Sequence, residues 1–400
     1  MTTFYDCIPM EIKQKIRSLQ KPAFVAVWMG LLTLPFLGVS GSVKLAAVLL
    51  AGSLLFFSYL RWVRSALFQN GIAGLQRKYR LLFAGKEVQG VRQAGMVLLV
   101  TLLLALPPLM NDYYIDVLTL AGIYVVLALG LNVVVGMAGL LDLGYVAFYA
   151  VGAYTYAILS TRYGLPFWPA LPIGGAAAAL VGVFLGVITL RLRGDYLAIV
   201  TLGFLMIVHL VLNNWDELTH GPNGILGIPN PSIGGWTFSQ PIHFYYLILI
   251  LVFLIVFVAY RLMQSRIGRA WIAIREDEMA ASAMGIPVTR MKILAFALGA
   301  SWAGIAGVFF AGRYAFVSPE SFTFFETVFV LSMVVLGGMG SIPGVILGAL
   351  LLVILPEVFR GFQDYRMLAF GGAMVLMMAF RPQGLIGNPR RKIELREEKV

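Results

Sequence analysis

Residues 261–292 read RLMQSRIGRAWIAIREDEMAASAMGIPVTRMK and form the largest polar insertion in the second half of an otherwise apolar chain. We call them the polar segment. Because long apolar runs lie on both sides, the polar segment is predicted to be a short amphipathic helix held at a membrane face. A membrane protein that has one ordered helix of this kind, and no enzyme domain of its own, is expected to use it as a docking site for a soluble partner.

The composition of the whole chain is typical of a membrane protein. Of its 400 residues, 60% are hydrophobic and only 12% are charged, and the mean hydropathy is +0.87. Since a helix needs about 20 mostly apolar residues to cross a bilayer, the sequence predicts an all-α polytopic protein with about twelve spans. The predicted spans cover residues 23–39, 43–60, 94–110, 115–136, 139–160, 167–190, 197–213, 244–261, 292–311, 322–338, 342–358 and 365–380.

Lysine and arginine are distributed unevenly between the predicted loops. If the N-terminus is cytoplasmic, 25 of the 30 Lys and Arg residues fall in cytoplasmic segments. Cytoplasmic loops are enriched in these residues, so both termini are expected in the cytoplasm. The net charge of +11 then lies along the inner leaflet of the lipid bilayer, which argues against nucleic acid as a partner. The cytoplasmic segments are residues 1–22, 61–92, 191–193, 261–292 and 381–400.

The predicted spans suggest three parts. Residues 1–92 form an N-terminal extension with two spans and a basic cytoplasmic loop, residues 93–388 form a transmembrane core of ten spans, and residues 389–400 form a basic cytoplasmic tail. Each half of the core would contain five spans. Because five is odd, the halves would run in opposite senses, as in inverted-repeat transporters. The longest outside loop, residues 213–243, is rich in Gly, Pro and Asn and is predicted to be an ordered, turn-rich cap or a docking surface facing the periplasm.

Several kinds of chemistry are missing from the sequence. No G-x-x-x-x-G-K-[S/T] motif is present, so any ATP must be bound by another subunit and no catalytic residue is assigned. Cys7 is the only cysteine, which excludes a cysteine metal site. The inner thirds of the spans carry almost no charge, which argues against an ion-coupled carrier. We therefore expect a transporter subunit with no metal and no cofactor of its own.

Two glycine clusters interrupt predicted spans, at residues 136–144 (GMAGLLDLG) and 337–344 (GGMGSIPG). They could be helix breaks that expose backbone to a transport pathway, or sites of tight helix packing. Asn132 is the most buried polar residue, for which an interhelical hydrogen bond is the default and a pathway contact the alternative. The pathway or gating candidates are Asn132, Gly136, Gly139, Gly337, Gly338, Gly340 and Gly344.

Seven ordered motifs between residues 112 and 388 resemble the LivM-type permease subunits of branched-chain amino acid ABC importers. This resemblance implies a bacterial inner-membrane importer of Leu, Ile and Val. It also implies three kinds of partner: a LivH-type sister permease, two ABC ATPase subunits that bind the ATP, and a periplasmic amino-acid-binding protein. The motifs are GLNVVVGMAGLLDLG, RLRGDYLAIVTLGF, GPNGI, GRAWIAIREDEMAA, FVSPESFTF, VLGGMGS and FRPQGL.

In ABC importers a cytoplasmic E-A-A-x-x-x-G helix inserts into the ATPase. Alignment on Gly285 places Met279 where that pattern has Glu, and the coupling helix is expected over residues 268–285. The charges of residues 275–278 would pair with the ATPase. The coupling candidates are Gly268, Arg269, Arg275, Glu276, Asp277, Glu278, Ala280, Ala281 and Gly285. The candidates for periplasmic docking are Asn223, Glu320 and Glu326.

Two alternatives remain open from the sequence. A permease of the same family could import urea, short amides or a broader set of amino acids. Alternatively, the chain could be a self-sufficient secondary carrier, which would transport its solute without ATPases and would respond to an ion gradient.

Overall fold

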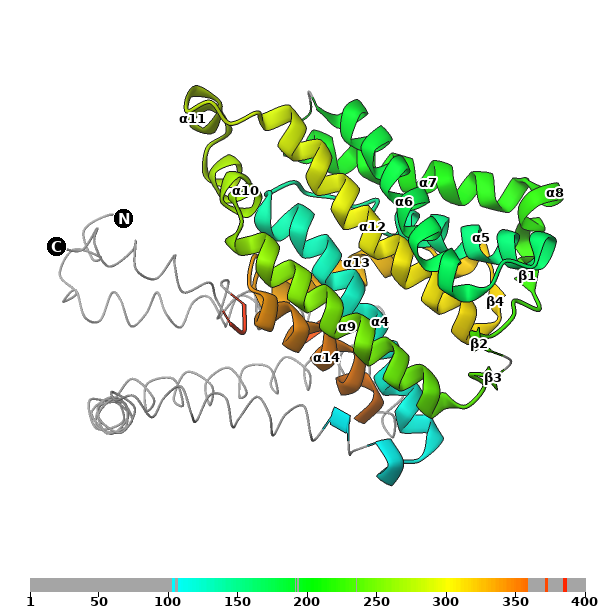
Figure 1. The fold of residues 1–400 in the computed structure, drawn as a ribbon. Helices are drawn as coiled ribbons and strands as arrows, with labels where there is room; N and C mark the ends of the chain where they lie inside the picture. Colours follow the sequence, from blue (N-terminus) through cyan, green and yellow to red (C-terminus); the bar gives the residue numbers. More distant parts are fainter. Residues whose placement is uncertain are drawn as a thin grey trace, which may run out of the picture. The chain divides into compact units, whose positions relative to one another are not determined.

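The computed structural model describes residues 103–104, 107–190, 192, 194–234, 236–358, 371–372 and 384–386, all of which belong to the unit Thr101–Val400. This part of the chain is a bundle of helices with a few two-residue strands at one end (Figure 1). The predicted spans 23–39 and 43–60, most of 94–110 and nearly all of 365–380 lie outside the described residues.

The described elements follow one another along the chain with few long connections. The helices of eight or more residues are α4 (Asp112–Leu131), α5 (Val146–Tyr163), α6 (Phe167–Thr189), α7 (Asp195–Asn214), α9 (Pro241–Gln264), α10 (Arg266–Glu276), α12 (Val288–Tyr314), α13 (Phe324–Gly337) and α14 (Ile342–Val358). The shorter helices are η1 (Pro107–Leu109), the π-helix η2 (Asn132–Met137), α8 (Asp216–Thr219), η3 (Gly221–Asn223), α11 (Glu278–Ala283) and η4 (Pro319–Ser321). The strands are β1 (Ile225–Leu226), β2 (Ser232–Ile233), β3 (Trp236–Thr237) and β4 (Phe316–Val317).

Six stretches of the described chain are long and apolar enough to cross a membrane. They are Asp112–Met137, Phe167–Thr189, Asp195–Asn214, Pro241–Gln264, Val288–Tyr314 and Pro319–Gly337, with α14 as a shorter apolar helix. Each coincides within a few residues with a predicted span, so the all-α, multi-pass architecture is confirmed. The predicted span 139–160 is placed differently. There the helix α5 begins only at Val146, and it is not among the six candidate spans.

Helix α12 lies at the centre of the bundle and contacts α4, α5 and α6. These contacts depend on glycines, because a Cβ added to Gly152 of α5 would lie 2.1 Å from the Gly304 carbonyl oxygen. A Cβ added to Gly304 would in turn lie 2.5 Å from the Gly174 carbonyl oxygen of α6. Small residues therefore let three helices approach to backbone contact, as they do where membrane helices pack closely.

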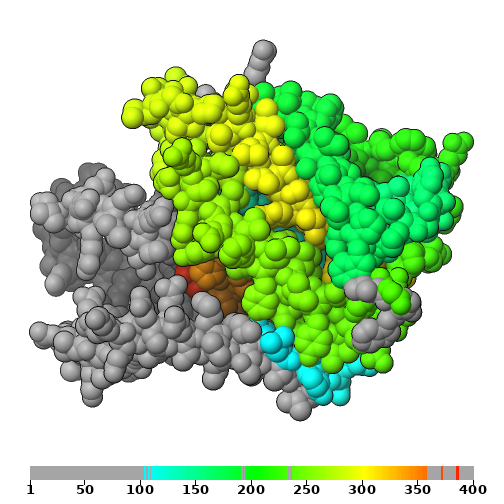
Figure 2. Space-filling model, in the orientation of Figure 1, coloured from blue at the N-terminus to red at the C-terminus, as the bar shows by residue number. Residues whose placement is uncertain are grey.

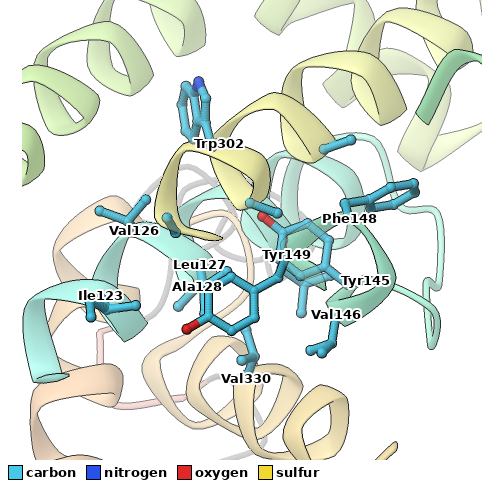
Figure 3. Close-up of a cluster of buried hydrophobic side chains, with 14 of the residues drawn as sticks. Ile123, Val126, Leu127, Ala128, Tyr145, Val146, Phe148, Tyr149, Trp302 and Val330 are labelled. Atoms are coloured by element: carbon cyan, nitrogen blue, oxygen red, sulfur yellow. The ribbon is translucent and has the colours of Figure 1, made fainter. Parts of the chain in front are cut away.

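The packed interior is built from aliphatic and aromatic side chains of α4, α5, α12 and α13 (Figure 3). Tyr145 is fully buried there, and its hydroxyl donates to the Gly299 carbonyl oxygen at 3.0 Å. Gly130 leaves the room for this hydroxyl, since a Cβ at Gly130 would lie 2.0 Å from it. A buried phenol is thus satisfied by the helix that it packs against, as buried polar groups require.

The strands lie at the end of the bundle opposite to α10 and α11 (Figure 1). Strand β1 pairs antiparallel with β4, with Ile225 opposite Val317. The Tyr156 hydroxyl donates to the Pro229 carbonyl oxygen at 2.7 Å, and Trp168 Nε1 donates to the Ser232 carbonyl oxygen at 3.0 Å. Residues 213–234 and 236–243 therefore form a turn-rich cap, as predicted.

Candidate functional site

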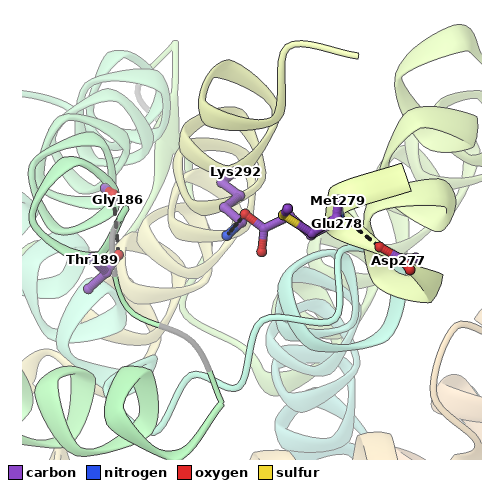
Figure 4. Close-up of polar contacts among 6 residues, drawn as sticks. All are labelled: Gly186, Thr189, Asp277, Glu278, Met279 and Lys292. Carbon is purple, nitrogen blue, oxygen red and sulfur yellow. Dashed lines mark hydrogen bonds and ion pairs between the residues drawn. The ribbon is translucent and has the colours of Figure 1, made fainter. Parts of the chain in front are cut away.

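Between the end of α9 and the start of α12, the polar segment forms two helices, α10 and α11, and not the single helix predicted over residues 268–285. Asp277 separates them, with an extended backbone (φ −153°, ψ 112°). Its Oδ1 accepts hydrogen bonds from the backbone N–H groups of Met279 at 2.8 Å and Ala280 at 3.0 Å (Figure 4). A side-chain oxygen that caps a helix start in this way competes with continuation of the preceding helix, so the acid predicted to meet a partner ends α10 and begins α11.

Helix α10 is fixed to the ends of α9 and α12. Trp271 is fully buried, and its Nε1 donates to the Met291 carbonyl oxygen at 2.8 Å. Gly268 is buried in the first turn of α10, where a Cβ would lie 2.4 Å from the Leu262 carbonyl oxygen of α9. The Ser265 hydroxyl caps α10 by accepting from Gly268 N at 3.2 Å. Displacement of α10 must therefore also move the ends of the two long helices.

The charged cluster at residues 275–278 is divided between the bundle and the surface. The Glu278 carboxylate pairs with Lys292 Nζ at 2.7 Å, and the lysine side chain is only 6% exposed (Figure 4). Glu276 and Asp277 are exposed, whereas Arg275 is half-buried. Glu278 therefore neutralises a buried lysine of α12 that would otherwise be costly to bury, and pairing of this cluster with an ATPase stays a prediction.

Helix α11 presents small and apolar side chains on its outer surface. Met279 is 68% exposed and Met284 is 84% exposed, while Ala280 is exposed between them and Ala281 packs inward. Gly285 (φ +82°) ends the helix, with its N–H bonded to the Ser282 carbonyl oxygen at 3.0 Å. Figure 2 shows α10 and α11 forming a corner of the surface beside the start of α12. Flexible methionines beside alanines suit a contact surface for another protein.

The first glycine cluster is a break between α4 and α5, and we call residues 132–145 the first break. It begins with the π-helix η2, and Gly139 then adopts a positive φ of +72° that ends helical geometry. The Asp142 carboxylate is buried and accepts from Gly144 N at 2.8 Å. Leu143 N donates to the Thr201 hydroxyl of α7 at 2.9 Å. These local bonds explain why α5 starts at Val146 and why the predicted span 139–160 began too early.

The second glycine cluster separates α13 from α14, and we call residues 338–341 the second break. Gly338 (φ +113°) and Gly340 (φ +81°) have backbone conformations that favour glycine. Gly337 and Gly344 lie in direct backbone contact, since a Cβ on either would lie 2.3 Å from the carbonyl oxygen of the other. The end of α13 is also covered by the segment 384–386, in which Leu385 N donates to the Leu336 carbonyl oxygen at 2.9 Å.

The two breaks meet inside the bundle, although 208 residues separate the atoms that join them. Gly340 N donates to Asn132 Oδ1 at 2.8 Å, and Asn132 is completely buried. A Cβ at Gly136 would lie 2.6 Å from Gly340 N, so the backbones touch. The interhelical bond expected for Asn132 is confirmed, and the structure brings Asn132, Gly136 and Gly340 together. The sequence had suggested the break positions but not their contact.

Arg275 reaches this junction from α10. Its Nη1 donates to the Gly136 carbonyl oxygen. Its Cγ lies 2.7 Å from the position that a Cβ at Gly139 would occupy, and its Nη1 lies 3.3 Å from that position at Gly340. No pattern in the sequence indicates that this arginine faces the bundle. In the sequence, Arg275 looks equivalent to Arg269 of the same polar segment. Arg269 is exposed, and its Nη1 donates to the Gln264 carbonyl oxygen at 2.8 Å.

The three candidates for periplasmic docking lie near the strand end of the bundle, but they differ in exposure. Asn223 in η3 and Glu320 in η4 are both exposed. Glu326, in the first turn of α13, is half-buried and accepts a hydrogen bond from the Tyr124 hydroxyl of α4 at 2.8 Å. Glu326 therefore joins two helices. Within the described ranges, no group of three His, Cys, Asp or Glu residues lies close enough together to hold a metal ion.

Residues 113–378 match the protein family described as "Branched-chain amino acid transport system / permease component". The chain is 48% identical over 364 residues to the high-affinity branched-chain amino acid transport system permease protein LivM of Escherichia coli K12, covering 85% of each chain. It is 49% identical to LivM of Salmonella typhimurium, covering 75% of this chain and 76% of that one. It is 26% identical to the permease protein LivH of E. coli K12, covering 68% and 93%. No solved structure matches.

Proposed function

Because the chain belongs to the family of permease components of branched-chain amino acid transport systems, we propose that it works as one half of a membrane pathway driven by separate ATPase subunits. In this proposal α10 and α11 receive the motion of the ATPase, and the two breaks open and close the pathway for Leu, Ile and Val. The chain itself is a multi-pass membrane subunit of a transport system and not an enzyme, and permease components of this kind carry no cofactor.

The observation that carries this proposal is the geometry of α10 and α11. They are two short helices at the end of the bundle, fixed to α9 and α12 through Trp271 and through the pair of Glu278 with Lys292. Their outer surface combines Met279 and Met284 with small residues. A helix held firmly to the membrane domain, with an apolar outer surface, can transmit force from a bound protein to the bundle.

The orientation of the chain follows from charge in this proposal. Six of the Lys and Arg residues lie within residues 261–292, so the end of the bundle with α10 and α11 faces the cytoplasm. The cap formed by residues 213–243 then faces the periplasm and meets a solute-binding protein, with Asn223 and Glu320 as exposed contacts. Both termini lie in the cytoplasm, and the membrane is the bacterial inner membrane.

The same proposal retains the predicted division of the chain. Residues 1–92 are an extension with two spans, residues 93–388 are a ten-span core with inverted halves, and residues 389–400 are a cytoplasmic tail. Similarity to both LivM and LivH supports a pathway formed between this chain and a LivH-type sister subunit. Two ATPase subunits and a periplasmic binding protein complete the proposed importer.

Purification of the tagged chain from its native membranes, followed by mass spectrometry, tests this assembly. We expect a sister permease and ABC ATPases to be recovered with the chain, together with a solute-binding protein whose ligand identifies the substrate. A binding protein specific for urea or short amides would change the substrate but not the architecture. Recovery of a lone chain that transports solutes in vesicles without ATPases would contradict the proposal.

A further inference from the structure

Among the coupling candidates, Arg275 is the one whose described contacts include residues of both breaks. These contacts suggest a specific role for its side chain. Its aliphatic part lies against Gly139 and its guanidinium donates to Gly136, both in the first break. The same guanidinium lies beside Gly340 of the second break. One side chain of α10 therefore touches both interruptions of the long helices.

The Gly136 carbonyl oxygen can accept this bond because the helix widens before it. In a regular α-helix it would accept from the N–H of residue 140. Here Leu140 N donates instead to the Val134 carbonyl oxygen at 3.0 Å, and Ala138 N donates to the Val133 carbonyl oxygen at 3.1 Å. The π-helix thus leaves a buried carbonyl group that needs another donor, and Arg275 supplies it.

The two breaks are themselves joined where Arg275 reaches them. Gly340 N donates to Asn132 Oδ1 at 2.8 Å, and the Gly136 and Gly340 backbones are in contact. Helix α10 is held to the start of α12 by Trp271. Any movement of α10 relative to α4 must therefore carry the Arg275 guanidinium along or break its bond to Gly136.

We propose that Arg275 is a positioning residue that transmits displacement of α10 and α11 to the two breaks and holds them closed on each other in the conformation described here. This inference rests on the proposed function of α10 and α11 as the coupling segment. It assigns Arg275 to the pathway side of that segment, whereas Met279 and Met284 form the side that meets the ATPase. Loss of the guanidinium should disconnect ATP hydrolysis from solute movement without releasing the ATPase.

The test uses the complete complex, reconstituted in lipid vesicles with its binding protein, and measures solute taken up per ATP hydrolysed. Arg275→Gln removes the charge and most donors, and we expect the ratio to fall on the order of tenfold while the ATPases stay bound. Arg275→Lys keeps one charged donor and should restore part of the ratio. Arg261→Gln makes the same charge change at the end of α9, where the guanidinium lies 5.5 Å from the Phe257 ring centroid, and should stay within about twofold of the wild type.

The outcomes separate the inference from the function on which it rests. A wild-type ratio in Arg275→Gln would overturn the inference. Loss of the ATPases from that variant would also overturn it, because Arg275 would then be a docking residue. If Arg275→Gln does not assemble, Arg275→Lys decides: a ratio below that of the wild type with the ATPases still bound supports the inference, and a wild-type ratio overturns it. Failure of the wild-type chain to bind ATPases would instead reject the proposed function.

Discussion

Replacement of Gly152 by leucine is expected to prevent the bundle from packing. A Cβ at this position would lie 2.1 Å from the Gly304 carbonyl oxygen and 2.4 Å from Gly304 Cα. Both are backbone atoms of α12, so no side-chain rotation can relieve the overlap, and α5 and α12 must separate along their whole contact. Overpacking usually costs about 1–3 kcal/mol, and a clash with backbone in a membrane bundle should exceed that range.

The thermal unfolding of the purified chain in detergent measures this effect, together with the yield of monodisperse protein. Gly203→Leu is the matched control, because Gly203 lies on an exposed face of α7 and a Cβ there meets no atom within 4 Å. We expect the Gly152 variant to be recovered poorly or to unfold at a much lower temperature, and the Gly203 variant to behave like the wild type. Equal stability of the two variants would refute the close contact of α5 with α12.

Substitution of both Met279 and Met284 by glutamate is expected to release the ATPase subunits. These side chains are 68% and 84% exposed on α11. In an apolar contact, a buried carboxylate without a partner costs several kcal/mol, and each 1.4 kcal/mol lowers affinity about tenfold. Two such groups should weaken binding by at least about a hundredfold, while the helix bundle keeps its stability because neither side chain packs within it.

Co-purification of the ATPases with the tagged variant measures the loss. Tyr163→Glu, at the opposite end of the bundle and 77% exposed, introduces a similar charge away from α11 and should retain the ATPases. Retention of the ATPases by the double methionine variant would place their binding surface elsewhere on the chain.

The positions of the long helices could be predicted from the sequence because each is an uninterrupted apolar run. Helix α9, for example, begins at Pro241 and ends at Gln264, close to the predicted 244–261. The outer cap could also be anticipated, since its Gly, Pro and Asn residues favour turns. The helices and the cap are both determined by residues close together in the chain, so their positions can be predicted from one sequence.

Contacts between distant residues could not be predicted in the same way. The bond from Gly340 to Asn132 and the pair of Lys292 with Glu278 depend on how the helices pack. Arg275 is charged and lies next to other charged residues in the sequence, which predicts that its side chain faces solvent or a partner protein. Only the packed structure shows that the Gly136 carbonyl oxygen accepts a hydrogen bond from Arg275 and that Gly139 leaves room for its side chain.

The division of the polar segment into two helices at Asp277 also differs from the prediction of one helix, because the amphipathic pattern continues across this residue. Aspartate is a common first residue of a helix and an unfavourable interior one. An aspartate at position 277 is therefore a sequence signal for the start of a new helix, α11.

We propose above that a separate ATPase, acting through α10 and α11, drives branched-chain amino acids through this chain and its sister subunit. Uptake of labelled leucine into vesicles that contain the purified complex and its binding protein tests it most directly. We expect uptake that requires ATP on the side of α10 and α11, requires the binding protein, and is abolished in the double methionine variant. Uptake that persists without ATPases and follows an ion gradient would contradict it.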